Sequence, residues 1–159
     1  MRKSQALKLY LELEKNLESF ASEIKKRGFI KFGEGSYKVT YSKNKLNYVI
    51  KLCSSVNDEF SHVPQLIKNF YIPPYFCDEQ IVIQQKANTN KVIAQRAYFK
   101  IKQKIGIPAC ESLDINCRNC GEINKKPVVF DFCELRGFDE VDERCLENMK
   151  KKDLTRRRS

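Results

Sequence analysis

The sequence predicts an α+β fold, because two segments with helical periodicity flank a run of consecutive strand-like segments. Apolar residues recur at helical spacing over Ser4–Lys26 and again over Asn88–Ile105. Between these helices, alternating or β-branched runs predict four strands, at Phe29–Phe32, Tyr37–Tyr41, Leu46–Cys53 and Gln80–Gln85. Short polar connections such as Ser42–Lys45 favour antiparallel pairing of the first three. A small antiparallel sheet with helices before and after it is therefore expected.

The N-terminal helix is expected to be continuous, since no Gly or Pro interrupts Ser4–Lys26, and Gly28 supplies its stop. A further helix is predicted at Val56–Phe70, broken or kinked by Pro64. The helix at Asn88–Ile105 offers a set of apolar residues for a buried face: Val92, Ile93, Ala97, Phe99 and Ile101.

The last third of the chain predicts a second, smaller hairpin. Strands at Cys120–Ile123 and Pro127–Asp131 are joined by a turn at Asn124–Lys126. A further helix is expected after this hairpin, followed by a tail.

Composition limits the protein class. The chain has 159 residues, of which 42% are hydrophobic, enough for one compact domain with appendages. No apolar run approaches the ~20 residues of a transmembrane helix, and the first residues lack the apolar block of a signal peptide. A cytoplasmic protein without membrane contact is expected.

The net charge of +10 favours polyanionic partners. Half of this excess lies in the C-terminal run KKKDLTRRRS, which contains one apolar side chain and cannot fold alone. Two interpretations of this basic tail stay open: a contact with nucleic acid or another acidic surface, and a solubilising end.

Three short motifs carry polar chemistry. Gly33 and Gly35 lie one residue apart between two predicted strands, where the missing side chains would let backbone approach a phosphate; an ordinary hairpin turn is the alternative. Lys51 ends the apolar triplet Tyr48–Ile50; either it points inward, where Glu59 could neutralise it, or it faces water at a sheet edge.

The third motif brings together oxygen-bearing side chains. Asp114 is followed five residues later by Asn119, and Asp131 ends the apolar run before Phe132. Carboxylate and amide oxygens on short loops suit a hard cation such as Mg²⁺ bound together with phosphate oxygens.

Taken in order, G-x-G-S-x-x-V, V-I-K, D-x-x-x-x-N and D-F-x resemble the motif set of the protein-kinase-like fold over about residues 29–135. The chain is most similar to the short kinase-like proteins of some phages and viruses, which would place it in the host cytoplasm. The resemblance implies an antiparallel N-lobe at 29–87 after an N-terminal helix at 1–28. A reduced helical C-lobe at 88–148 and the basic tail at 149–159 would follow.

The resemblance also implies residue roles. ATP would be held by Gly33, Gly35, Ser36, Val39 and Lys51, with Glu59 pairing to Lys51 and Lys86–Ala87 hydrogen-bonding the adenine. Asp114 would accept the proton of the acceptor, a protein or a small molecule, and Asn119 with Asp131 would hold Mg²⁺.

The sequence departs from the family at three places. Ser112 and Leu113 stand where the family has His and Arg, Cys133 replaces the Gly after Asp-Phe, and the chain ends 26 residues after Cys133. A non-catalytic nucleotide-binding pseudokinase is therefore an alternative to an active phosphotransferase.

A second alternative uses the cysteines. Cys117 and Cys120 form a C-x-x-C-G zinc knuckle, and Cys110 and Cys133 flank it. An irregular four-thiolate zinc site combined with the basic charge would indicate a nucleic-acid-binding module.

Overall fold

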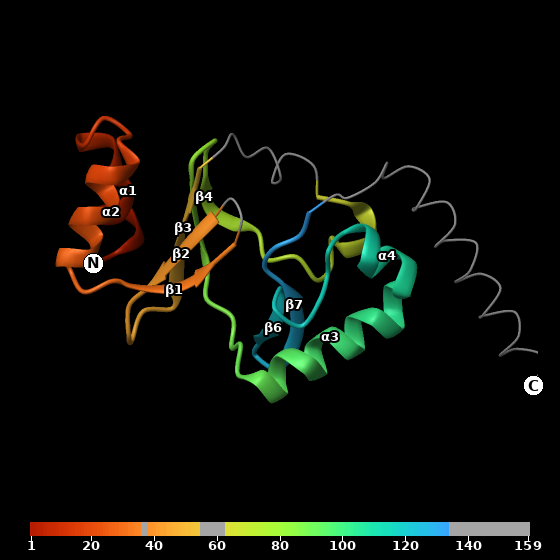
Figure 1. Cartoon of the computed structure of the whole chain (residues 1–159). Helices are drawn as coiled ribbons and strands as arrows, with labels where there is room; N and C mark the ends of the chain where they lie inside the picture. Colours follow the sequence, from red (N-terminus) through yellow and green to blue (C-terminus); the bar gives the residue numbers. More distant parts are fainter. Residues whose placement is uncertain (36–37, 55–62, 134–159) are drawn as a thin grey trace, which may run out of the picture. The chain divides into compact units, whose positions relative to one another are not determined.

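The computed structural model describes residues 1–35, 38–54 and 63–133, and the chain divides into two compact units (Figure 1). The first unit comprises Met1–Phe60 and Pro73–Lys86. The second comprises Ser61–Ile72 and Ala87–Ser159. The chain therefore changes unit three times, after Phe60, after Ile72 and after Lys86.

The first unit contains a five-stranded antiparallel sheet, so the predicted α+β class with an antiparallel sheet is confirmed. The strands are β1 (Ile30–Glu34), β2 (Lys38–Ser42), β3 (Tyr48–Cys53), β4 (Pro74–Cys77) and β5 (Ile81–Gln85), in the order β1-β2-β3-β5-β4. The edge strand β4 was not predicted, because Pro73 and Pro74 suggest a break. Proline is compatible with the first position of an edge strand, which is where Pro74 lies.

The N-terminal segment forms two helices, α1 (Lys3–Glu12) and α2 (Leu17–Lys26), instead of the single helix expected. The break lies at Glu14 and Lys15, which both have positive φ, and Asn16 then caps α2 by accepting a hydrogen bond from the Ser19 amide at 2.9 Å. Local capping therefore outweighs the continuous helical periodicity of this segment.

Gly28 ends α2 as predicted. Its φ of +86° lets the Gly28 and Phe29 amides donate to the carbonyl groups of Lys25 and Ile24, at 2.9 and 3.0 Å. The chain then enters β1.

The helices α1 and α2 pack on one face of the sheet (Figure 1). Their buried residues share a core with alternate residues of β2, β3 and β5. The helical contribution includes Ala6, Leu9, Tyr10, Phe20 and Ile24, and the sheet contributes Tyr41, Tyr48, Ile50, Leu52, Ile81 and Ile83. A polar bond adds to this packing, since the Tyr10 hydroxyl donates to Asp78 Oδ2 at 3.0 Å.

The second unit contains α3 (Lys91–Ile105), α4 (Ile107–Ser112) and the hairpin of β6 (Cys120–Ile123) and β7 (Lys126–Val129). The helix α3 begins later than predicted because Asn90 is its N-cap, accepting from the Val92 amide at 3.1 Å. The predicted turn between β6 and β7 is present, with positive φ at Asn124 and Lys125.

The predicted buried face of α3 is partly wrong. Ala94, Ala97, Ile101 and Ile105 are buried, whereas Val92 is 68% exposed and Phe99 is 53% exposed. The buried side combines two alanines with two isoleucines and packs against β6 and β7, whereas Val92 and Phe99 face outward.

The first half of the predicted helix at Val56–Phe70, residues 56–62, lies outside the described residues. In its described part, Pro64 precedes a single 3₁₀ turn, η2 (Gln65–Ile67). The chain then runs beside β7, where the Val129 amide donates to the Phe70 carbonyl at 2.8 Å and the Ile72 amide donates to the Val129 carbonyl at 3.0 Å.

Within the described ranges, no helix has both the length and the apolar character needed to cross a membrane.

Candidate functional site

The first unit aligns two of the predicted phosphate-binding residues across its sheet. Gly33 on β1 is paired with Thr40 on β2, and Thr40 is paired with Lys51 on β3. Paired residues of adjacent strands point to the same face, and strands lie about 4.8 Å apart, so Gly33 and Lys51 are about 10 Å apart on one face. This face is opposite to the one covered by α1 and α2.

Lys51 is 3% exposed and lies on β3, which has a hydrogen-bonded strand on each side. The alternative of a water-facing edge lysine is therefore excluded. Ser42 and Gln84 lie on the same face and are also buried. Three of the four buried polar residues of the described chain thus share the face of Lys51, and Glu122 in the second unit is the fourth.

Neither Gly33 nor Gly35 needs to be glycine for the fold as described. Neither has positive φ, and a Cβ at Gly33 would meet no atom of the described chain within 4 Å. A Cβ at Gly35 would meet only the Lys38 carbonyl oxygen, at 4.0 Å. The space beside both glycines is open, as the close approach of a ligand to backbone requires.

Val39 does not lie with Lys51. It is paired with Leu52 and packs against the core under α1 and α2, on the other face of the sheet. The assignment of Val39 to the nucleotide is therefore corrected, and Thr40 takes the place on the face of Lys51. Strand alternation could have revealed this only with the β2–β3 register known, which the sequence does not contain.

Lys86 and Ala87 were expected to hydrogen-bond an adenine, and the structure shows that the Lys86 amide already has a partner. The Lys86 amide donates to the Asn47 carbonyl at 2.8 Å, so this N–H is already used inside the first unit. The Lys86 ammonium lies 5.1 Å from the ring centre of Phe32, the residue before Gly33. The Lys86 side chain thus lies near the part of β1 that contains Gly33.

In the second unit, Asp114 follows α4 with a φ of +50°, an uncommon conformation for a residue with a side chain. Two side-chain amides hold it there. Asn119 Nδ2 donates to the Asp114 carbonyl at 2.7 Å, and Asn116 Nδ2 lies 3.1 Å from that carbonyl and 3.2 Å from Asp114 Oδ1. Asn116 Oδ1 in turn accepts from the Arg118 amide at 2.9 Å.

The segment that contains Asp131 is joined to this loop on both sides. The Phe130 amide donates to the Asn119 carbonyl at 3.1 Å, and the Cys133 amide donates to the Leu113 carbonyl at 3.0 Å. Two backbone bonds therefore bracket Asp131. The second unit brings together Asp114, Asn119 and Asp131 from separate parts of the sequence.

The same contacts show what occupies the positions that depart from the kinase pattern. Leu113 is fully buried, so it stabilises the loop by apolar packing and by its carbonyl bond to Cys133. Phe132 is buried as well, and its ring packs edge-on against Tyr71 at 5.4 Å between centres. The loop is supported by backbone bonds and apolar side chains of the second unit.

The chemistry of the donors in this loop suits a hard cation. Asn119 uses Nδ2 to hold Asp114, which leaves Oδ1 as its acceptor atom, and Asp131 contributes a half-buried carboxylate. Oxygen donors of this kind are preferred by Mg²⁺, which keeps several waters and phosphate oxygens in its shell. The residues present fit the group that the sequence implied.

A zinc site formed by cysteines does not fit the structure. Across residues 1–35, 38–54 and 63–133, which include Cys110, Cys117, Cys120 and Cys133, no group of three or more His, Cys, Asp or Glu side chains is placed to hold a metal. Burial, with a smaller contribution from neighbouring Cys110 and Cys117, raises the pKa of Cys120 to about 12. Cys120 is fully buried on β6 and belongs to the apolar core of the second unit.

Some predicted residues lie outside the described ranges: Ser36, Glu59, the basic tail and the helix expected before it.

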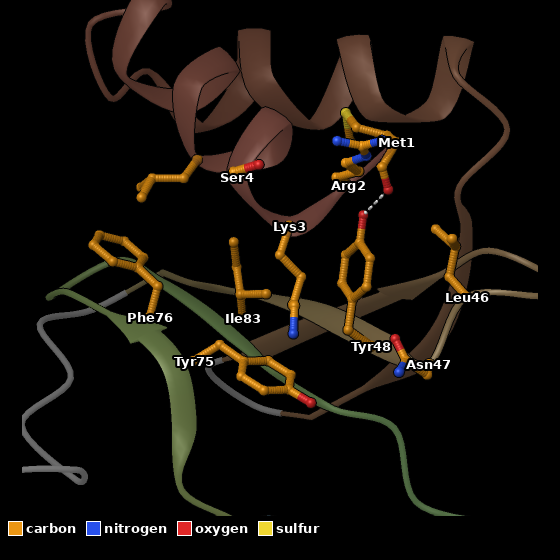
Figure 2. A pocket seen from close by; sticks show the side chains of 11 residues that line it. Met1, Arg2, Lys3, Ser4, Leu46, Asn47, Tyr48, Tyr75, Phe76 and Ile83 are labelled. Atoms are coloured by element: carbon orange, nitrogen blue, oxygen red, sulfur yellow. Dashed lines mark hydrogen bonds between the residues drawn. The ribbon is translucent and has the colours of Figure 1, made fainter.

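The first unit also contains an open cavity of about 740 Å³, between the start of α1 and the helix-covered face of the sheet. Figure 2 shows the Tyr48 hydroxyl donating to the Met1 carbonyl, at 2.7 Å, with Lys3 extended toward the ring of Tyr75. None of the predicted site residues lines this cavity. It lies on the opposite side of the sheet from Lys51.

No protein-family model, curated protein or solved structure matches this chain.

Proposed function

We propose that the protein is a kinase-like phosphotransferase that uses ATP and Mg²⁺ to phosphorylate a protein or small-molecule acceptor. The observation that carries this proposal is the loop of the second unit, where Asn119 is hydrogen-bonded to Asp114 and backbone bonds from Phe130 and Cys133 hold the segment of Asp131 beside this loop. A catalytic-loop Asp, an Asn five residues later and a metal-binding Asp are the residue set that kinase chemistry requires.

The first unit supports the proposal independently. Gly33 and Lys51 lie on one face of the sheet, with open space beside the glycine and a buried ammonium group on the central strand. Glycine backbone approaching the phosphates and a lysine on the third strand are the parts of a kinase N-lobe that hold nucleotide phosphates.

The proposed roles follow from this chemistry. Lys51 and the glycine backbone bind and orient the phosphates, and Asn119 and Asp131 provide the oxygen ligands for Mg²⁺. The metal would neutralise phosphate charge when bound. Asp114 accepts the proton of the acceptor hydroxyl, and the amide of Asn116 orients its carboxylate. Phosphoryl transfer depends mainly on such positioning and charge neutralisation.

The first test is a thermal-shift titration of the full chain with ATP, with and without Mg²⁺. Binding at 100 times Kd should stabilise the protein by about 2.7 kcal/mol, and Mg²⁺ should increase the shift. Asp131→Asn should remove the Mg²⁺-dependent part. Asp153→Asn, which changes a carboxylate of the tail, is the matched control. The proposed function is wrong if neither ATP nor Mg·ATP raises the thermal-unfolding midpoint of the wild type or of any variant.

The glycine face provides a second test. The Cβ that Gly33→Ala adds would have no described atom within 4 Å, so the fold should be retained. The new methyl group would, however, occupy the space proposed for the phosphates. We expect ATP affinity to fall about tenfold without loss of thermal stability. Unchanged affinity would mean that phosphates do not approach this strand.

Catalysis is tested separately, by turnover of [γ-³²P]ATP in the wild type and in Asp114→Asn, with casein, the protein itself and aminoglycosides as acceptors. Activity lost in Asp114→Asn supports the phosphotransferase. Equal turnover in the two proteins, together with retained Mg·ATP binding, would instead support the non-catalytic pseudokinase, in which buried Leu113 stands at the position of the family's Arg.

A further inference from the structure

The helix α3 carries a concentrated positive charge. Its sequence, KVIAQRAYFKIKQKI, contains basic residues in every turn and no acidic residue. The basic residues are Lys91, Arg96, Lys100, Lys102 and Lys104. A helix of this composition attracts polyanions, independently of the basic tail.

The outward face of α3 is not uniformly polar. Because Ala94, Ala97, Ile101 and Ile105 form its buried side, helical geometry places Val92, Phe99 and their neighbours on the opposite side. The ring of Phe99 is 53% exposed in the middle of this face. An exposed aromatic ring of this kind offers a flat apolar surface that the fold itself does not use.

Amides and a cation surround the ring. Gln95 and Gln103 lie four residues before and after Phe99, so they are its neighbours along the same face, and both are exposed. The Lys102 ammonium lies 5.5 Å from the centre of the Phe99 ring and 5.3 Å from that of Tyr98. Donors, acceptors and positive charge therefore border one stacking surface.

Two of the five basic residues are already engaged. Arg96 donates two hydrogen bonds of 2.8 Å to the carboxylate of Glu122 on β6, and the Lys100 ammonium forms an ion pair of 4.0 Å with the same carboxylate. Arg96 thus fixes α3 to the hairpin. The lysines at positions 91, 102 and 104 remain to meet anionic groups.

We propose that the outward face of α3 binds single-stranded nucleic acid. Phe99 would stack on a base, Gln95 and Gln103 would face base edges, and the lysines at positions 91, 102 and 104 would contact phosphates. An exposed ring flanked by lysines is the combination by which proteins hold single strands, whose bases are free to stack. A duplex hides those base faces.

A membrane surface fits this face less well. An interfacial helix needs a broad apolar side. On the outward face of α3, Gln95 and Arg96 separate Val92 from Phe99, and Gln103 follows Phe99.

Fluorescence anisotropy of the full chain tests the proposal, using labelled 20-nucleotide single-stranded DNA, single-stranded RNA and the matching duplex at several salt concentrations. Either single strand should bind more tightly than the duplex, and the RNA and DNA arms identify the preferred sugar. Phe99→Leu should weaken single-strand binding about tenfold, whereas Phe99→Tyr, which keeps the ring, should retain it.

Charge variants test the phosphate contacts. The double variant Lys91→Gln/Lys104→Gln, which changes two exposed lysines of α3, should reduce the slope of log K against log salt by about 1.4. The control Lys8→Gln/Lys26→Gln changes two exposed lysines of α1 and α2 and should leave it unaltered. The tail is present in all variants, so a difference between them belongs to α3.

Three results would overturn the proposal. These are equal binding of all Phe99 variants, binding that is unaffected by the α3 lysines, and tighter binding to vesicles of anionic phosphatidylserine than to any oligonucleotide. None of these results depends on whether the protein binds ATP.

Discussion

The contact of Asn116 with Asp114 could not be inferred from the sequence. In the motif D-x-x-x-x-N, Asn116 stands at a position where the pattern specifies no residue. Its side chain lies against both the carbonyl and the carboxylate of Asp114, and its own oxygen is held by the Arg118 amide. These contacts depend on the positive φ of Asp114, which bends the loop back on itself. On the proposed function, Asn116 is a positioning residue for Asp114.

Asn116→Ala should therefore lower kcat about tenfold to a hundredfold, the effect of losing a hydrogen bond to a charged group. KM for ATP should stay the same, because Asn116 is not assigned to the nucleotide. Steady-state kinetics of Asn116→Ala and of Cys117→Ala, an exposed neighbour in the same loop, make the comparison. A rise in KM with constant kcat would contradict the positioning role.

Glu122 gives a prediction about pH. Hydrogen bonds from Arg96 hold the pKa of Glu122 below its ordinary value, against the opposing effect of burial. A carboxylate with a lowered pKa in the folded state stabilises the protein above its unfolded-state pKa of about 4.3, and this contribution is lost as pH falls through the folded-state pKa. The Arg96–Glu122 pair should thus stabilise the second unit at neutral pH and not in strong acid.

Urea denaturation between pH 3 and pH 7 tests this expectation. Glu122→Gln should be less stable than the wild type at pH 7, and the difference should shrink below about pH 4. Glu111→Gln, an exposed carboxylate on α4, should show no such trend. A difference that is constant over this range would mean that the ion pair does not contribute through its charge.

At the scale of elements, the hairpin of β6 and β7 is the part that positions the loop. It lies between Asn119 and Asp131 in the sequence, and its two strands return the chain so that the Phe130 amide meets the Asn119 carbonyl. Asn88 pairs with Glu122 through two backbone bonds of 2.9 and 3.0 Å. The hairpin is thereby attached to the segment that precedes α3.

Gly121 on β6 makes this close attachment possible. A Cβ at this position would lie 2.6 Å from the Asn88 carbonyl oxygen and 3.1 Å from the Ala87 Cβ. Gly121→Ala should therefore destabilise the protein by about 1–3 kcal/mol, since backbone must shift to relieve the contact. Thermal or urea denaturation measures this loss. Gly33→Ala, with open space around its Cβ, is the matched control, and equal stabilities of the two variants would refute the packing explanation.

At the scale of the whole molecule, each of the two units carries one set of the proposed residues. Gly33 and Lys51 lie in the first unit, and Asn119 and Asp131, the proposed ligands for Mg²⁺, lie in the second. The role of each unit can therefore be measured separately in the intact protein.

Hydrogen exchange followed by mass spectrometry should detect this division. ATP without Mg²⁺ should slow exchange mainly around residues 33–51, and added Mg²⁺ should extend protection to residues 114–131, because metal coordination orders the second set. MgCl₂ without nucleotide is the control. Unchanged exchange around residues 33–51 with ATP, or around residues 114–131 with Mg·ATP, would contradict the role proposed for that set of residues.

The sequence by itself determined the α+β class, the stop of α2 at Gly28, the central strand with Lys51, and the candidates Asp114, Asn119 and Asp131. These follow from local signals: periodicity, glycine at a helix end, apolar runs and residue spacing. Such signals act over a few residues, so they can be read without knowledge of contacts between distant segments.

Only the tertiary structure decided which face each strand residue occupies and which helix residues are buried. The register of β2 on β3 places Val39 on the face under α1 and α2 and Thr40 beside Lys51, because side chains alternate along a strand. Likewise, the packing of α3 against β6 and β7 buried two alanines and two isoleucines of this helix and left Phe99 exposed. Both outcomes depend on contacts between segments distant in sequence, which local pattern does not encode.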